Sequence, residues 1–373
     1  MSQNCSDFEL LAADIRRQPG LLAERLSYLR LTAEQICAGL PPPSRIYLVA
    51  CGDGLSAALA ACYTWERLLG CPVEAVPAMT FSRYMVENAP PGALAIAISQ
   101  SGRVIRVIEA LACAQRRGLE TLVVTNKPES PLAGLVTEGH VFKLGFNRLG
   151  FTPGASAYTY TLAALYELAA AMSRQRGVAQ DVQEQLDRTP QAVGAAVESA
   201  WQPAGDFARQ LSRGNVIFTL GSGPAFGTAH YTMRKLYEIC QSKAVLLETE
   251  EYAHDAFYAM DRETPTILYA PPDAGFRRCR EIAGYLAGIG CPLLVVSGAD
   301  QQAHLVREGI SFAGLPGASA VETTITYAVV AQALACQAGK ILGGAFYACD
   351  NPTRYNQGDA QIYESERMDL EDE

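Results

Sequence analysis

The feature that most constrains the fold of this chain is a pattern that occurs twice along it. An apolar run, a glycine-rich loop and a helical pattern occupy residues 46–68, and the same succession returns at residues 216–238. The loop glycines Gly52 and Gly221 lie 169 positions apart. Internal repetition of this kind indicates repeated structural units. We therefore predict two copies of one fold in tandem.

The segments that follow each loop keep the same order in both halves. They are short, continuous and rich in Val, Ile and Leu, which is typical of parallel strands buried on both faces with helices between them. A long apolar helical segment closes each half, at residues 156–172 and 319–335. The predicted strand segments after the first are 71–81, 93–102, 120–127 and 140–144 in one half and 243–252, 265–275, 291–300 and 311–315 in the other.

These patterns predict an α/β fold with two doubly wound, flavodoxin-like parallel sheets, each of about five strands. Ligands of such sheets bind at the carboxyl ends of the strands. The chain after residue 358 carries seven acidic residues and one basic residue, which predicts a solvated acidic tail. The predicted organisation is an N-terminal helical segment at 1–44, a first domain at 45–175, linker helices at 176–213, a second domain at 214–345 and a C-terminal segment with the acidic tail at 346–373.

Composition narrows the classes of function. Lys and Arg number 30 and Asp and Glu 39, a net charge of −9, which argues against nucleic acid and membrane as partners because both need basic surfaces. The 11 cysteines form no CxxC pair and no cluster with zinc spacing, so we expect buried free thiols. We also expect no metal and no organic cofactor. The sequence shows no secretory signal pattern and no apolar run of ~18 residues, and we expect a cytoplasmic protein.

Two loops at predicted strand ends have the composition of an anion site. Glycine lets backbone N–H groups approach a ligand, and the N-terminus of the next helix favours negative charge. The alternative is that the serines only cap the following helix. The first loop is not a strict dinucleotide fingerprint, because Ala57 stands where that pattern needs its third glycine. The candidate ligand contacts are Gly52, Asp53, Ser99, Gln100, Ser101 and Arg103.

The repeat, the sequence SQSG at 99–102 and the stretch LGSGPAFGTAHYTMRKLYEI at 220–239 together resemble the sugar isomerase (SIS) family. The resemblance extends over about residues 45–356. It is closest to the tandem arrangement in the isomerase half of glucosamine-6-phosphate synthase and in fructosamine-6-phosphate deglycases. It implies two SIS domains and a small-molecule sugar phosphate as the partner, with the phosphate held by the SQSG loop.

The resemblance also implies roles for residues of the second half. Glu238 matches the base that moves a proton between carbons 1 and 2 of the sugar, and Lys235 matches a lysine three residues before it. His254, sixteen residues after Glu238, matches the histidine that assists ring opening and reaches the site from a neighbouring subunit. Glu251 matches a glutamate three residues before that histidine. The resemblance therefore implies that the protein works as a homodimer or a larger homo-oligomer whose active sites are shared between subunits.

Some positions depart from the family pattern. Asp53 and Gly54 replace the usual Thr or Ser after the first loop glycine, and Val104 replaces a usual Thr. An aspartate beside a phosphate is unfavourable by about 1–4 kcal/mol at 4 Å. Arg103 can offset this cost with a charge-assisted hydrogen bond. A non-phosphorylated sugar therefore stays an alternative ligand. About 44 residues precede the first strand and no lysine follows Lys340, so we expect no glutamine-dependent ammonia transfer.

The chemistry explains why these residue types are needed. A ketose and an aldose interconvert when one base lifts a proton from one carbon and returns it to the next. A carboxylate on a rigid helix fits this role when partial burial raises its pKa. Tyr231, Lys235 and Glu238 share one face of the predicted helix. A deglycase begins with the same proton removal from a sugar–amine adduct, so these residues do not separate the two activities.

Non-catalytic interpretations stay open beside these. Glu238 can be a surface acid paired with Lys235, and His254 an ordinary loop histidine. The protein can be a sugar-phosphate-binding regulator, although no basic helix-turn-helix region precedes residue 45, or a degenerate lobe that supports a partner enzyme. Tyr158 is expected in a helix core. Arg354, in the segment DNPTRYNQ at 350–357, either meets the substrate or lies in a surface loop.

Overall fold

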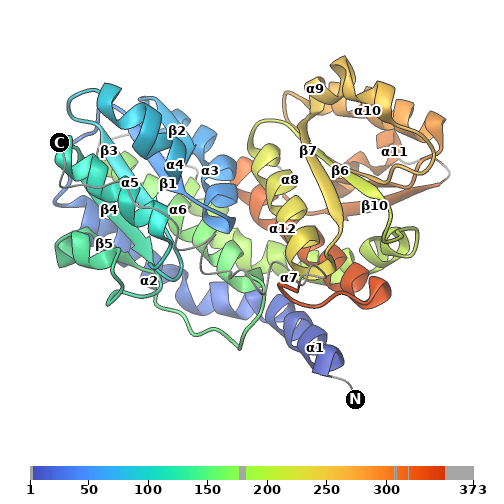
Figure 1. Ribbon diagram of the computed structural model, residues 1–373, viewed down its shortest axis with the longest axis horizontal. Helices are drawn as coiled ribbons and strands as arrows, with labels where there is room; N and C mark the ends of the chain where they lie inside the picture. The colour runs from blue at the N-terminus through green and yellow to red at the C-terminus, as the bar shows by residue number, and fades with distance from the viewer. Residues whose placement is uncertain (1–2, 176–181, 306, 308, 318, 349–373) are drawn as a thin grey trace, which may run out of the picture. The chain divides into compact units, whose positions relative to one another are not determined.

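The predicted strands form two separate parallel sheets. The computed structural model describes residues 3–175, 182–305, 307, 309–317 and 319–348 (Figure 1). Contacts divide these residues into two units, each built around one sheet. The N-sheet unit comprises residues 27–147 and 164–175, and the C-sheet unit comprises 3–26, 148–163 and the described residues of 182–348.

The sheet of the N-sheet unit has the strand order β2-β1-β3-β4-β5, with all pairs parallel. Its inner strands β1 and β3 are buried at every position, because helices cover both faces of the sheet. The strands are β1 (Ile46–Ala50), β2 (Val73–Pro77), β3 (Leu94–Ile98), β4 (Glu120–Thr125) and β5 (Val141–Lys143), and the main helices are α3 (Asp53–Leu69) and α5 (Ile105–Arg116).

The sheet of the C-sheet unit repeats this topology with the order β10-β9-β8-β6-β7. Read in chain order, both sheets run second, first, third, fourth, fifth, so the prediction of two doubly wound domains is confirmed. The strands are β6 (Val216–Gly221), β7 (Lys243–Glu248), β8 (Thr266–Ala270), β9 (Leu293–Gly298) and β10 (Ile310–Leu315). The connecting helices are α8 (Pro224–Lys235) with the π-helical turn η5 (Leu236–Cys240), α9 (Thr249–His254) with η6 (Ala256–Ala259), α10 (Phe276–Ile289) and α11 (Gln302–Leu305).

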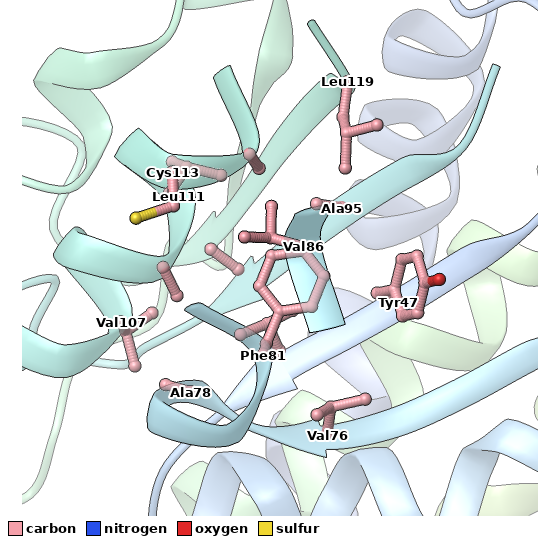
Figure 2. Close-up of a cluster of buried hydrophobic side chains, with 14 of the residues drawn as sticks. Tyr47, Val76, Ala78, Phe81, Val86, Ala95, Val107, Leu111, Cys113 and Leu119 are labelled. Atoms are coloured by element: carbon pink, nitrogen blue, oxygen red, sulfur yellow. The ribbon is translucent and has the colours of Figure 1, made fainter. Parts of the chain in front are cut away.

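One face of the first sheet shows how the apolar pattern becomes a core. Side chains from the strands meet Phe81 and Val86 of the segment after β2 and Val107 of α5 (Figure 2). The ring of Phe81 lies 5.1 Å from the ring of Tyr47 on β1. This packing fixes α5 against the sheet, and so fixes the loop between β3 and α5 at the carboxyl edge.

Helices outside the two repeats complete the C-sheet unit. The predicted helical start of the chain is α1 (Gln3–Arg16) and α2 (Gln18–Cys37), and the predicted linker contains one long helix, α7 (Val182–Ala208). Both α1 and α7 pack against the closing helix α12 (Ala320–Leu342). α12 is long and apolar enough to cross a membrane by length and composition alone, but 78% of its most apolar window is buried inside the protein, as in a core helix.

The helix that closes the first repeat connects the two units. α6 (Ala155–Gln175) begins among residues of the C-sheet unit and ends in the N-sheet unit. Its side chains are buried along most of its length. The first turn of α6 is therefore part of the surroundings of α8, which leads into the η5 turn that carries Glu238.

Candidate functional site

The two predicted ligand loops of the N-sheet unit lie side by side. Gly52, with φ of 62°, ends the first loop and precedes α3. A Cβ atom on Gly54 would come 3.0 Å from the carbonyl oxygen of Ile98, the last residue of β3. Glycine at this position lets α3 start directly against the end of β3, which places Asp53 in the first turn of α3 next to the start of the SQSG loop.

The SQSG loop is held by its own backbone and side chains. Ser99 is buried, and its Oγ accepts a hydrogen bond from the Gly102 N–H at 3.1 Å. The Gln100 carbonyl accepts from the Asn126 N–H at 3.2 Å. Ser101 and Arg103 are exposed, and the Ser101 Oγ accepts from the Arg103 N–H at 3.3 Å.

The start of α5 distinguishes between the two interpretations of this loop. Val104 is the N-cap residue of α5, and no side chain caps the helix there. The serines therefore do not serve as helix caps, which was the alternative to a ligand loop. An N-terminus without a side-chain cap, beside exposed donors, suits an anion.

Replacing Gly102 by alanine tests whether the SQSG loop needs the positive φ and the close packing that glycine allows. Gly102 has φ of 61°, and a Cβ would collide with the side chain of Ser130. Gly118→Ala is the matched control, because Gly118 also has a positive φ, of 77°, but its Cβ would meet no atom within 4 Å. We expect about 1–2 kcal/mol of lost stability from the control and about 1–3 kcal/mol more from Gly102→Ala, measured by urea unfolding. Equal losses would contradict this account of the loop.

The C-sheet unit contains a buried ion pair. The Lys235 Nζ donates to the Glu238 Oε2 at 2.5 Å. The lysine side chain is only 1% exposed, while the glutamate side chain is 26% exposed. The carboxylate therefore compensates the buried ammonium, and it keeps a face that a ligand can reach. This pairing agrees with the face-sharing predicted from the spacing.

Two tyrosine rings complete the surroundings of the lysine. The Nζ of Lys235 lies 5.1 Å from the ring centre of Tyr231, one turn earlier on α8, in a cation–π contact. Tyr231 stacks on Tyr158 of α6 with ring centres 3.7 Å apart, and its hydroxyl donates to the Gly154 carbonyl at 3.0 Å. The prediction placed Tyr158 in a helix core, and it is buried. No pattern in the sequence indicates that Tyr158 supports the ring beneath Lys235.

The backbone at Glu238 is also unusual. Residues 236–240 form a π-helical turn, an element that often occurs at functional sites. The N–H of Tyr347, beyond α12, donates to the Glu238 carbonyl at 2.7 Å. The Gln241 side chain donates to the Ala345 carbonyl at 2.6 Å and accepts from the Ala345 N–H at 3.0 Å. The segment after α12 thus holds the turn that carries Glu238. Arg354, predicted to meet the substrate, lies outside the described residues.

His254 and Glu251 lie on another part of the same unit. They belong to α9, which starts where β7 ends, at the carboxyl edge of the sheet. α8 begins at that edge after β6 and returns to the amino edge, because β6 and β7 are parallel neighbours. Glu238 and His254 of one chain therefore lie at opposite edges of the sheet. Both α9 side chains are exposed, so the role of His254 in a neighbouring subunit's site stays a prediction.

The remaining reactive groups are the candidate metal ligands and the thiols of the part of the chain that the structure describes. The described residues contain no group of three or more His, Cys, Asp or Glu side chains placed to hold a metal ion. The described cysteines are free thiols. Burial raises the pKa of the Cys62 and Cys336 thiols to about 11, which keeps them protonated at neutral pH and poor as nucleophiles.

A double-mutant experiment tests the ion pair. Glu238→Ala leaves the buried ammonium of Lys235 without its carboxylate, and we expect a loss of about 2–4 kcal/mol. Lys235→Met, added to Glu238→Ala, removes the buried charge that has lost this carboxylate and should recover part of the loss. Urea unfolding of the single and double variants measures this. A double variant that is less stable than Glu238→Ala would contradict a charge-compensation role for Glu238.

Known proteins resemble this chain over most of its length. Residues 40–170 match the SIS domain family. Glutamine–fructose-6-phosphate aminotransferase [isomerizing] of Bradyrhizobium diazoefficiens is 28% identical over 345 residues, which cover 89% of this chain and 56% of that protein. The corresponding protein of Gloeobacter violaceus is 29% identical over 276 residues, covering 69% and 44%. The chain spans about half the length of the curated relatives it matches.

Solved structures show the same fold. The C-terminal domain of glucosamine-fructose-6-phosphate aminotransferase from Francisella tularensis has a TM-score of 0.79 at 19% identity, covering 91% of this chain and 98% of that one. Tagatose-6-phosphate ketose/aldose isomerase from Escherichia coli has a TM-score of 0.72 at 17% identity, covering 92% and 97%.

The sheet order defines a tandem α/β protein with two flavodoxin-like domains. The chain contains an SIS domain at residues 40–170, is similar to glutamine–fructose-6-phosphate aminotransferases over about half of their length, and shares its fold with the solved structures named above.

Proposed function

We propose that the protein is an enzyme that transfers a proton between carbons 1 and 2 of a sugar 6-phosphate, with Glu238 as the base. The observation that carries this proposal is the Lys235–Glu238 ion pair on a buried tyrosine platform. It gives a carboxylate that is fixed in position and still partly exposed. Homology to phosphosugar isomerases supports the same class of reaction.

The ion pair suits a base that takes a proton from carbon. The Lys235 ammonium at 2.5 Å orients the Glu238 carboxylate, and a carboxylate accepts a proton in its ionised form. The π-helical turn and the hydrogen bond from Tyr347 fix the backbone, so the carboxylate does not have to be ordered when substrate binds. Proton removal gives an enediol, and return of the proton to the adjacent carbon completes the isomerisation.

The strand-tip loops of the N-sheet unit are proposed to hold the phosphate. Ser99, Gln100 and Ser101 with the start of α5 supply the donors, and Arg103 supplies positive charge to offset Asp53. Gly52 allows close approach of the backbone. Glu251 is a further proposed substrate contact. Lys235, predicted as a substrate contact, is only 1% exposed, so we propose that it acts through Glu238 and that its substitution affects kcat more than KM.

A deglycase or deaminase acting on a sugar-amine 6-phosphate is the second candidate. Its first step is the same proton removal, from a carbon bearing nitrogen, and the product then loses its amine to water. One structural neighbour is titled glucosamine-6-phosphate deaminase, from Thermotoga maritima, with a TM-score of 0.68 at 17% identity. Assays with hexose 6-phosphates and with a fructosamine 6-phosphate distinguish the two activities.

Replacing the proposed base by its amide tests the reaction. Glu238→Gln keeps the size of the side chain and an oxygen for Lys235 but cannot accept the proton. We expect kcat to fall about 10²–10⁴-fold while substrate binding, followed by isothermal titration calorimetry, changes little. Glu198→Gln, an exposed carboxylate on α7, is the control and should retain full activity.

Two results would contradict the proposal. Native turnover by Glu238→Gln would remove Glu238 from the mechanism. Binding of sugar phosphates by the native protein without turnover of any tested substrate would favour the alternative, a non-catalytic sugar-phosphate-binding regulator.

We also propose that active sites are shared between subunits, because Glu238 and His254 lie at opposite edges of the sheet in one chain. Mixing equal amounts of Glu238→Gln and His254→Gln protein after unfolding and refolding should then restore activity. Random pairing into dimers makes half of them mixed, and each mixed dimer has one intact site of two. The expected recovery is therefore about a quarter of native activity, measured by turnover. No recovery in dimers shown to be mixed would contradict shared sites.

A further inference from the structure

The chain that follows α12 lies against the turn that carries Glu238. We call residues 343–348 the capping segment. Gly343, with φ of 66°, ends α12 in the left-handed conformation that glycine adopts most easily. A Cβ atom on Gly344 would collide with the carbonyl oxygen of Ile239 in η5. The backbone of the capping segment therefore lies directly against the backbone of η5, and glycine at residue 344 allows this approach.

The side-chain amide of Gln241 joins η5 to the capping segment. Gln241 is the first residue after η5. Its Nε2 donates to the Ala345 carbonyl at 2.6 Å, and its Oε1 accepts from the Ala345 N–H at 3.0 Å. One amide thus pairs with both backbone groups of one residue. A glutamine amide supplies the donor and the acceptor that this pairing requires, whereas an ionised carboxylate supplies only acceptors.

The backbone carbonyl of Glu238 is where these contacts meet. It accepts from the Tyr347 N–H at 2.7 Å and from the Gln241 Nε2 at 3.4 Å. The last carbonyls of a helix have no partner within the helix, and here the capping segment and Gln241 provide partners from outside it. The backbone of the proposed base is therefore held by the same two residues that join η5 to the capping segment.

Both donors belong to residues whose backbone is strained. Among the described residues, the non-glycine residues with a positive φ are Gln241, at 51°, and Tyr347, at 56°. A positive φ is uncommon at such residues, and glycine is the usual residue where a helix ends in this conformation. Strain of this kind persists where the surrounding bonds hold it, and it is concentrated at functional sites. The strain at Gln241 therefore points to a role for its side chain that glycine would not fill.

We propose that Gln241 is a positioning residue for the proton transfer. Its amide holds the capping segment against η5, and together they fix the backbone of Glu238, whose carboxylate accepts from Lys235. Without the amide, the carboxylate is expected to leave the position from which it reaches carbons 1 and 2 of the sugar. The inference rests on the proposed function and adds a residue that acts on kcat through Glu238 rather than on the substrate.

The test uses two variants that separate the amide from the backbone strain. Gln241→Met keeps the length of the side chain and loses both hydrogen bonds to Ala345. Gln241→Gly also loses the amide but relieves the positive φ. We expect both variants to lower kcat about 10–100-fold and to keep KM within threefold, for the hexose 6-phosphate or fructosamine 6-phosphate that the native protein converts. A purely structural residue would not change kcat in a folded variant.

Gln337→Met is the matched control. The Gln337 amide donates to the Trp201 carbonyl and so joins α12 to α7, without a part in the contacts between η5 and the capping segment. We expect this variant to unfold at a lower urea concentration and to keep native kcat. Circular dichroism establishes that each variant is folded before kinetics are compared, and Gln241→Gly carries the comparison if Gln241→Met does not fold.

The outcomes separate this inference from the proposed function. Native kcat in the folded Gln241 variants, with turnover lost in Glu238→Gln, would overturn the positioning role and leave the proposed base in place. An equal fall of kcat in Gln337→Met would also overturn it, because any loosening of the unit would then be sufficient. Native turnover by Glu238→Gln, or no turnover of any tested substrate by the native protein, would overturn the proposed function and this inference with it.

Discussion

The buried ammonium of Lys235 is the constraint on which the candidate catalytic site depends. A charge with 1% exposure must be compensated, and Glu238 at 2.5 Å compensates it. The neighbouring structure is arranged around this pair. Tyr231 lies against the ammonium and stacks on Tyr158. Glu238 lies in a π-helical turn, and the backbone after α12 donates a hydrogen bond to that turn. A carboxylate held so firmly can be exposed to substrate without losing its position.

The fold could be predicted because its signal is local. The apolar runs that became β1, β3, β8 and β9 are buried along their whole length, and their order repeats in both halves. The assignment of α1 and α7 to the C-sheet unit could not be read from the same pattern. The apolar residues of α1 and α7 indicate that these helices are packed, but they do not identify the helix that they contact. That helix is α12, which lies more than a hundred residues from α7 and more than three hundred from α1 in the sequence.

The site was predictable to the extent that it depends on spacing along one helix. Lys235 and Glu238 stand three residues apart, and this spacing alone favours their ion pair. The stack of Tyr158 on Tyr231 and the hydrogen bond from Tyr347 join segments 73 and 109 residues apart (231 − 158 and 347 − 238), and no local pattern marks them. Residues such as His254, whose proposed role needs a second copy of the chain, depend on an assembly that a single chain does not contain.

The central claim is that Glu238 removes a proton bound to carbon, and hydrogen exchange at the substrate measures that step directly. In heavy water, proton NMR follows the entry of deuterium at carbons 1 and 2 of fructose 6-phosphate and glucosamine 6-phosphate, whether or not net product forms. The account predicts deuterium entry at one of these carbons with the native protein, and entry slowed at least a hundredfold when residue 238 is glutamine. Deuterium entry at the native rate in that variant, or none with the native protein, would contradict the account.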